Sequence, residues 1–240
     1  MPAGQMADSP AATLPSAGFA RRKGTLLMTF WQTVRPAQPP LAPLRQARQT
    51  VCLALAGAAL GVFSKWLDTQ ASNTLPPLLE QLDVRNFLGR LAPWLLWAAL
   101  IAAGSRSPRW AAGNVFAFLA AMLAGYYGYC AAAAGFFPKN YAMIWVGLTL
   151  ASPLLAVPCW YARADGGLAF VLSSGVLAVL FWASFSYGWL YLQPVSPLEL
   201  VTFAVGAVCF RRRTLAATLL QWLAAFAAAW VLSLLPFSVV

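Results

Sequence analysis

Long apolar stretches alternate with short loops from Thr50 to the C-terminus, and arginines collect in every second loop. Seven such stretches lie near residues 50–66, 87–104, 110–135, 141–162, 167–192, 196–210 and 214–237. A helix needs about 20 apolar residues to cross the hydrocarbon core of a bilayer, and fewer where charged ends reach the interface. The sequence therefore predicts an all-α fold, a polytopic transmembrane helical bundle of about seven spans (six to seven).

The distribution of basic residues predicts the orientation of the chain, because cytoplasmic loops of membrane proteins carry an excess of Lys and Arg. With a cytoplasmic N-terminus, the outer side holds only Lys65, Arg85, Arg90 and Lys139 of the 16 basic residues. The cytoplasmic side then holds Arg21, Arg22, Lys23, Arg35, Arg45, Arg48, Arg106, Arg109, Arg163, Arg211, Arg212 and Arg213. We therefore predict that the N-terminus lies inside and the C-terminus outside.

The stretch 196–210 has two interpretations, because it is short and follows Pro194 and Pro197. A re-entrant segment there would leave the arginines at 211–213 on the outer side, against the charge rule. The charge distribution therefore favours a crossing.

Composition excludes several classes of function. The chain is 61% apolar and 9% charged, whereas a soluble domain has roughly 25% charged residues. The net charge of +10 arises from residues that flank apolar stretches, so we expect no nucleic-acid partner. Residues 1–49 are rich in Pro and Ala, and we expect a flexible basic cytoplasmic tail there, followed by a transmembrane domain over 50–240. Met28 is an alternative start of the chain, so no function is assigned to residues 1–27.

The residues that usually carry catalysis or bind metals are scarce. The chain has no histidine, the commonest general base and zinc ligand. Its four cysteines lie singly in four different apolar stretches, and we expect them to be small buried apolar residues: Cys52, Cys130, Cys159 and Cys209. No P-loop, GxSxG or dinucleotide-binding pattern occurs. We therefore expect no enzymatic activity, no cofactor and no metal site.

Small residues recur every four positions in two of the predicted spans. In the first span Gly57 and Gly61 form a GxxxG motif, and Ala54 and Ala58 form a second small pair. The third span carries Gly113, Ala117, Ala121 and Gly125 at the same spacing. Small-xxx-small patterns allow the backbones of membrane helices to approach closely. They predict tight packing within this protein or, as the alternative, docking to a membrane partner subunit or a second copy.

Polar residues cluster at the predicted outer ends of the spans. Arg90 and Lys65 lie where a helix enters the hydrocarbon, a position where charge is costly unless it pairs, reaches the interface or faces a cavity. Asp68, Glu80 and Asp83 are nearby acidic partners, and Lys139 and Glu199 extend the group. One interpretation is a set of salt bridges that fixes the loop. The other is an outward-facing ligand pocket with the lining residues Lys65, Asp68, Arg85, Arg90, Tyr127, Lys139 and Asn140.

The stretch from Gly61 to Gly188, which contains the segments GVFSKWLDT, NFLGRLAPW, AGYYGY, GFFPKNYAMIW and SPLLA, resembles small bacterial integral membrane proteins of unassigned function. A looser similarity is to the substrate-binding components of energy-coupling-factor transporters, compact helical bundles that dock a coupling subunit through small-xxx-small faces. The Gly57/Gly61 and Ala54/Ala58 pairs match that feature, whereas no vitamin-specific motif matches and the seventh span departs from that family.

Two functional hypotheses follow from these observations. In the first, the protein is a solute-binding or permease component of a transporter in the bacterial inner (plasma) membrane. In the second, it is a non-catalytic structural or assembly protein of that membrane with no small-molecule substrate. In both, the lipid bilayer is its main partner.

Overall fold

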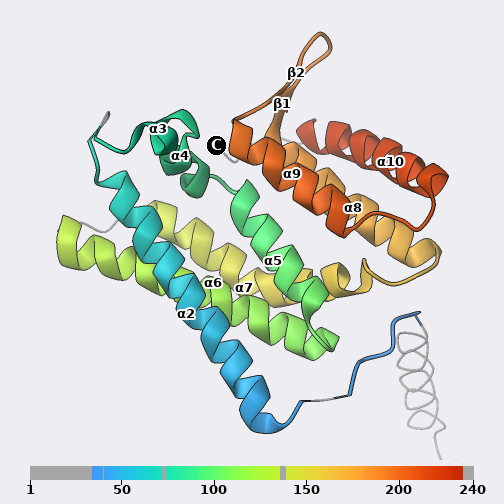
Figure 1. The fold of residues 1–240 in the computed structure, drawn as a ribbon, viewed down its shortest axis with the longest axis horizontal. Helices are drawn as coiled ribbons and strands as arrows, with labels where there is room; N and C mark the ends of the chain where they lie inside the picture. Colours follow the sequence, from blue (N-terminus) through green and yellow to red (C-terminus); the bar gives the residue numbers. More distant parts are fainter. Residues whose placement is uncertain (1–33, 40, 72–73, 136–138, 235–240) are drawn as a thin grey trace, which may run out of the picture.

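The computed structural model describes residues 34–39, 41–71, 74–135 and 139–234, and these residues are predominantly helical (Figure 1). Five helices are long and apolar enough to cross a membrane: α2 (Pro43–Asp68), α6 with its continuation (Pro108–Ala133), α7 (Lys139–Tyr161), α8 (Gly167–Ser184) and α10 (Leu215–Ser233). Two shorter apolar helices are α5 (Ala92–Gly104) and α9 (Pro197–Cys209). The first of the five includes residues 43–49, which the sequence analysis assigned to the tail.

The remaining elements are short. Helices α3 (Pro77–Gln81) and α4 (Val84–Gly89) lie between α2 and α5, and a π-helical turn (Cys130–Ala134) continues α6 (Pro108–Tyr129). Strands β1 (Phe185–Tyr187) and β2 (Leu192–Pro194) pair antiparallel, with Phe185 opposite Pro194. The seven longer helices run alternately in opposite directions (Figure 1). We call the end with α3, α4 and the β-hairpin the hairpin end, and the end with Arg106, Arg163 and residues 211–213 the basic end.

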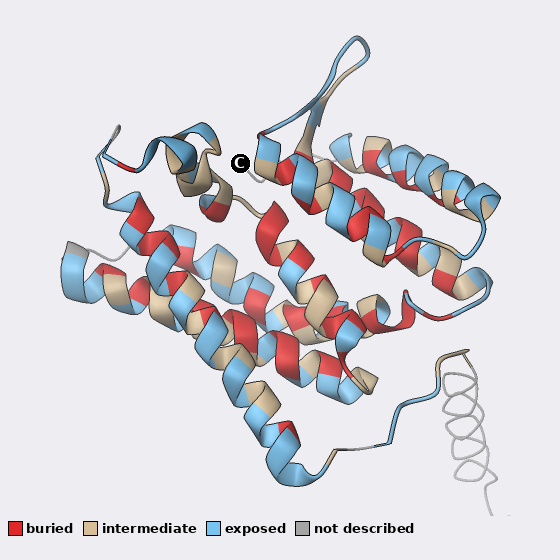
Figure 2. Ribbon diagram, in the orientation of Figure 1, coloured by how far each residue is buried: buried red, intermediate tan, exposed pale blue. Residues whose placement is uncertain are grey.

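The helices form two groups that meet at α5 (Figure 1). Helix α6 packs against α2 and α7, and α8 packs against α9 and α10. Helix α5 contacts α6 and α7 on one side and α8 and α9 on the other, so it belongs to the apolar cores of both groups. Figure 2 shows buried residues mainly where helices face one another and exposed residues on the outer sides. Many exposed residues are large and apolar, such as Leu154 and Val208, as expected for helices that face lipid.

Two of the predicted spans, 87–104 and 167–192, are longer than the helices that the structure has there. The stretch 87–104 is divided at Arg90, whose backbone is extended, and α5 begins beyond it with Pro93 in its first turn. The helix of the stretch 167–192 ends at Ser184 and the chain continues into the hairpin, so the predicted span was wrong beyond that residue. Hydropathy counts apolar side chains, and an apolar run of a few residues fits a strand as well as a helix.

The chain before α2 is held at the basic end by Arg35. Its guanidinium donates hydrogen bonds to the carbonyl oxygens of Trp160 and Ala103, near the C-termini of α7 and α5, and lies 4.2 Å from the centre of the Trp160 ring. Burial, and secondarily the charge of Arg163, lowers the pKa of Arg35. A cation at two helix C-termini satisfies carbonyl groups that have no partner within the helix. The part of the predicted tail before residue 34 lies outside the described residues.

Candidate functional site

A small cavity opens among α2, α4, α5, α6 and α7 at the hairpin end. Its volume is about 30 Å³, and it is lined by Ser64, Leu88, Gly89, Trp94, Met122, Leu123, Tyr126, Tyr127, Tyr141 and Trp145. Five of these ten residues are aromatic. A cavity needs about 10–15 Å³ to hold one water molecule, so this space takes one or two.

A second cavity of about 100 Å³ lies among α5, α6 and α7. Its walls are almost entirely apolar, apart from the hydroxyls of Thr149 and Ser152 on α7. Both residues are buried, and the Ser152 hydroxyl donates to the Thr149 carbonyl oxygen at 2.7 Å. For comparison, a dry engineered protein cavity of roughly 150 Å³ binds benzene. The second cavity therefore suits a small apolar body.

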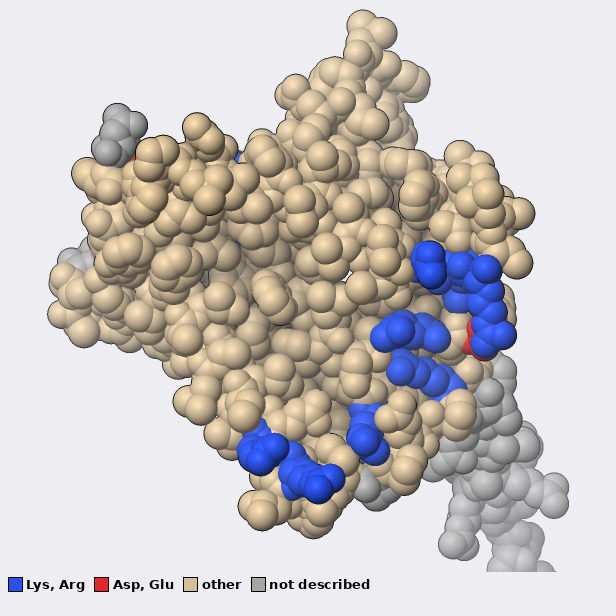
Figure 3. All heavy atoms as spheres, viewed as in Figure 1, with Lys and Arg blue, Asp and Glu red and all other residues tan. Residues whose placement is uncertain are grey.

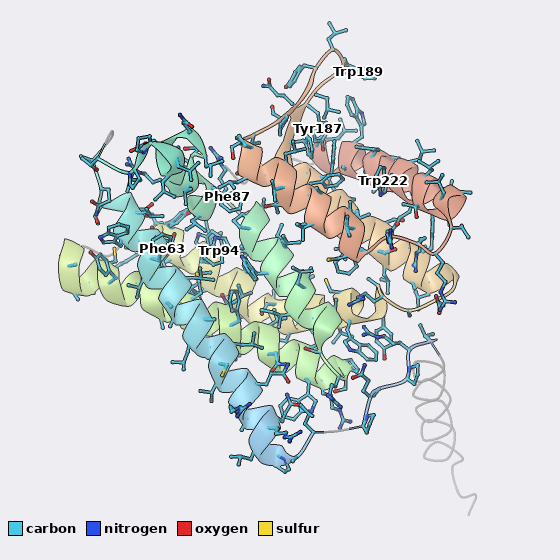
Figure 4. All side chains as sticks on the ribbon, viewed as in Figure 1. Phe63, Phe87, Trp94, Tyr187, Trp189 and Trp222 are labelled. Carbon is cyan, nitrogen blue, oxygen red and sulfur yellow. The ribbon has the colours of Figure 1, made fainter. Side chains whose placement is uncertain are left out.

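The two cavities share Trp94 and Trp145, so these two indoles separate them. Trp94 is buried, and its Nε1 donates to the Leu88 carbonyl oxygen at 2.9 Å (Figure 4). Trp145 is half-buried and contacts Tyr141, with ring centres 6.2 Å apart.

An ion pair and a tyrosine lie beside the first cavity. Lys65 is nearly buried, its Nζ lies 3.6 Å from Asp68 Oδ2, and it lies 5.3 Å from the centre of the Tyr126 ring. The Tyr126 hydroxyl donates to the same carboxylate at 2.7 Å. The carboxylate thus contacts both a cation and a hydrogen-bond donor.

A second ionic network joins the two helix groups at the hairpin end. Arg90 Nη1 donates to Glu199 Oε1 at 2.8 Å, and Arg90 Nη2 donates to Asp83 Oδ2 at 2.9 Å. The Glu199 side chain is fully buried and also accepts a hydrogen bond from Ser196. Asp83 has a left-handed backbone (φ 54°) and accepts a hydrogen bond from Asn86 Nδ2 at 2.6 Å. Glu199 is on α9, so Arg90 links the α4–α5 connection to the other group.

The lengths of α5 and α9 indicate the depth of this network. Each helix has 13 residues, which corresponds to about 20 Å of helix. Both end near the basic end, and the hydrocarbon core is about 30 Å thick. If the basic end lies at one interface, Arg90 and Glu199 lie below the other interface. Charged groups inside a membrane usually pair and mark functional positions.

The predicted ligand residues are distributed over several places. Tyr127 lines the first cavity, and Lys65 and Asp68 contact its wall through Tyr126. Arg90 belongs to the Glu199 network, and Arg85 lies 3.7 Å from Glu80 and donates to the Ala71 carbonyl oxygen. Lys139 and Asn140 are exposed in the first turn of α7. Trp94, Trp145 and Tyr141 are not among the predicted ligand residues, because no spacing in the sequence marks which aromatic side chains border a cavity.

The predicted small-residue faces lie mainly between α2 and α6. A Cβ atom added to Gly57, Gly61 or Gly125 would lie 2.1–2.3 Å from a carbonyl oxygen of the opposite helix, so these backbones are in direct contact within one chain. The alanines of the pattern, Ala54, Ala58, Ala117 and Ala121, are half-buried. Gly113 is exposed and has no atom within 4 Å of such a Cβ.

Other expectations concern cysteines and metals. Cys130 is buried and Cys159 and Cys209 are half-buried, but Cys52 is exposed, so the expectation of four buried cysteines was wrong for that residue. Cys52 lies on the side of α2 that faces away from α6. Among the described residues, no group of three or more His, Cys, Asp or Glu residues could hold a metal ion.

Comparison of the chain with protein-family models, with curated proteins and with solved structures finds no match.

Proposed function

We propose that the protein is a multi-pass protein of the bacterial inner membrane with about seven spans, its N-terminus inside and its C-terminus outside. The alternating directions of α2, α5, α6, α7, α8, α9 and α10 support this topology. Arg212 and Arg213 contact the loop between α7 and α8, so α9 ends where α8 begins, which supports a crossing over a re-entrant segment. The basic end is then the cytoplasmic side.

In this orientation the protein is a solute-binding or permease component whose pocket opens to the outer side. The observation that carries the proposal is the pair of cavities that meet at Trp94 and Trp145. Together they provide an aromatic entrance and an apolar interior with two hydroxyls. Ligand sites are typically apolar cavities with a few polar groups that orient the ligand. The solute class that fits is a small, flat, largely apolar body with one polar edge.

The Arg90–Glu199 pair has a defined role in this proposal. It connects α5, which lines the second cavity, to α9 in the other helix group. The Glu199 carboxylate is fully buried, so its separation from Arg90 is costly and the pair favours one relative position of the two groups. The pair therefore holds the cavities in the closed form, and its opening would accompany solute entry.

A structural or assembly role is the second candidate, and the small volume of the first cavity favours it. A space of about 30 Å³ admits water but no metabolite. The direct backbone contact of α2 with α6 also suits a permanently packed bundle.

The experiment that separates the two candidates is native mass spectrometry of the gently purified full-length protein, combined with identification of any released small molecule. Ala156→Leu fills the second cavity, whereas Ala227→Leu makes the same chemical change at an exposed position of α10. The solute proposal predicts a bound molecule in the wild type and in Ala227→Leu that is lost from folded Ala156→Leu. A folded wild-type protein without any bound molecule would favour the structural role.

A further inference from the structure

A large hollow lies at the basic end between the C-terminus of α9 and the N-terminus of α10. Its volume is about 580 Å³, and its lining includes Arg211, Arg212 and Arg213, which we call the arginine triplet. An adjoining hollow of about 300 Å³ shares the triplet and reaches Arg163 and Asp165. Figure 3 shows basic side chains gathered at this end of the visible face, with acidic atoms beside them. The two hollows together are lined by four arginines and one carboxylate, that of Asp165.

Arg212 has hydrogen-bond donors that the described residues leave unused. Its Nη1 donates to the Ala164 carbonyl oxygen at 2.9 Å, but its Nε and Nη2 are buried and have no acceptor among those residues. Buried donors of a charged group are costly when unpaired. Burial also lowers the pKa of Arg212, against the opposite effect of Asp165. An anion with several oxygen atoms would satisfy these donors.

The surroundings strengthen the preference for an anion. Asp165 accepts from Arg213 at 2.8 Å, so one carboxylate faces four arginines when Arg163 is included. Helix α10, which begins at Leu215, directs the positive end of its dipole toward the same hollow.

Apart from Thr214 and Thr218, the remaining walls of the larger hollow are apolar. Val208, Leu215 and Trp222 line it, and the first two are among the most exposed apolar side chains of their helices. Helices α9 and α10 both pack against α8 but contact each other little, so the surface between them is open. A free phosphate ion needs no apolar wall, whereas a phospholipid places acyl chains beside its headgroup. Basic pockets between transmembrane helices on the cytoplasmic side suit anionic lipids.

We propose that the arginine triplet binds the headgroup phosphate of an anionic phospholipid of the inner leaflet. The phosphodiester oxygens accept hydrogen bonds from Arg212 and its neighbours, and the acyl chains lie along the apolar sides of α9 and α10. This site is distinct from the cavities at the hairpin end and does not depend on solute binding.

Native mass spectrometry of the detergent-purified full chain, titrated with phosphatidylglycerol or phosphatidylcholine, tests the proposal. Each basic residue near a membrane surface contributes about fivefold to the affinity for anionic lipid. We expect Arg211→Gln/Arg212→Gln/Arg213→Gln to lower the affinity for the first bound phosphatidylglycerol molecule by about 100-fold. The control Arg45→Gln/Arg48→Gln/Arg109→Gln removes the same charge at the same end of the protein. It should lower the affinity for the first phosphatidylglycerol by less than about fivefold.

A single substitution distinguishes the loss of lipid binding from a folding defect of the triple variant. Arg211 is exposed, so Arg211→Gln should keep the wild-type unfolding temperature while it lowers phosphatidylglycerol affinity by about fivefold. Equal affinity of the wild type for both lipids, or an equal loss in the control triple variant, would overturn the proposal. Displacement of the lipid by inorganic phosphate at the same concentration would identify a free-phosphate site instead.

Discussion

Replacing Gly57 by Ala tests the packing of α2 against α6. The new Cβ atom would lie 2.2 Å from the carbonyl oxygen of Phe118, whereas a carbon atom normally stays about 3.3 Å or more from a carbonyl oxygen. The clash is with backbone, so no side chain can rotate away, and the helices must separate by roughly 1 Å. Overpacking of this kind costs about 1–3 kcal/mol.

A matched substitution isolates this cost. Gly113→Ala makes the same change within α6, where no atom lies within 4 Å of the new Cβ. Both variants gain up to about 1 kcal/mol of helix propensity. The difference between them therefore reports the clash alone, and we expect Gly57→Ala to be less stable than Gly113→Ala by about 1–3 kcal/mol.

The assay is reversible unfolding in detergent mixed with increasing SDS, followed by circular dichroism, with the wild type measured in parallel. Gly61→Ala should behave like Gly57→Ala, since its Cβ would lie 2.1 Å from the Met122 carbonyl oxygen. If Gly57→Ala and Gly113→Ala unfold at the same SDS fraction, the two helices are not in backbone contact and the reasoning fails.

Three further predictions concern polar contacts. Glu199→Gln removes the fully buried carboxylate from Arg90, which keeps Asp83 and is partly exposed, and should lower the free energy of unfolding by about 1–2 kcal/mol. Partial recovery is expected in Glu199→Gln/Arg90→Gln, and additive losses would show that the pair is uncoupled. Tyr187→Phe removes a 2.6 Å hydrogen bond from the hairpin to the Ala229 carbonyl oxygen of α10 and should lower the free energy of unfolding by about 1 kcal/mol. An unchanged unfolding midpoint would mean that the hairpin does not stabilise α10. Arg35→Gln should lower the free energy of unfolding by about 1–2 kcal/mol, because it removes contacts with two helix C-termini. Amide hydrogen exchange at the ends of α5 and α7 should become faster in this variant. Unchanged exchange would contradict the capping role of Arg35.

The sequence predicted the helices best where the apolar pattern is long. Helix α7 spans Lys139–Tyr161, close to the predicted 141–162, because a run of more than 20 uncharged and mostly apolar residues leaves few alternatives. Helix α2 extends beyond the predicted 50–66 at both ends because polar residues such as Gln46 continue a helix without adding hydropathy. The break at Arg90 and the hairpin after Ser184 depend on backbone conformation, which hydropathy does not encode.

The candidate site was predictable in its charges but not in its cavities. An arginine entering the hydrocarbon needs a partner, and Asp83, one of the three predicted acidic partners, contacts Arg90. Glu199, which extended the predicted polar group, is its second partner. The separation of the cavities by Trp94 and Trp145 depends on how three helices pack and on two side-chain rotamers. Neither is determined by residue spacing.

Both the solute site and the lipid site depend on the topology, so cysteine accessibility in intact cells tests the account most directly. In a cysteine-free background, single cysteines replace Thr74 and Gln193 at the hairpin end, and Gly104 and Leu215 at the basic end, all exposed positions. Seven spans with the N-terminus inside predict that a membrane-impermeant maleimide labels the first two in intact cells and the last two only after the membrane is opened. Labelling of Gly104→Cys or Leu215→Cys in intact cells would show that α5 or α9 does not cross, and would contradict the account.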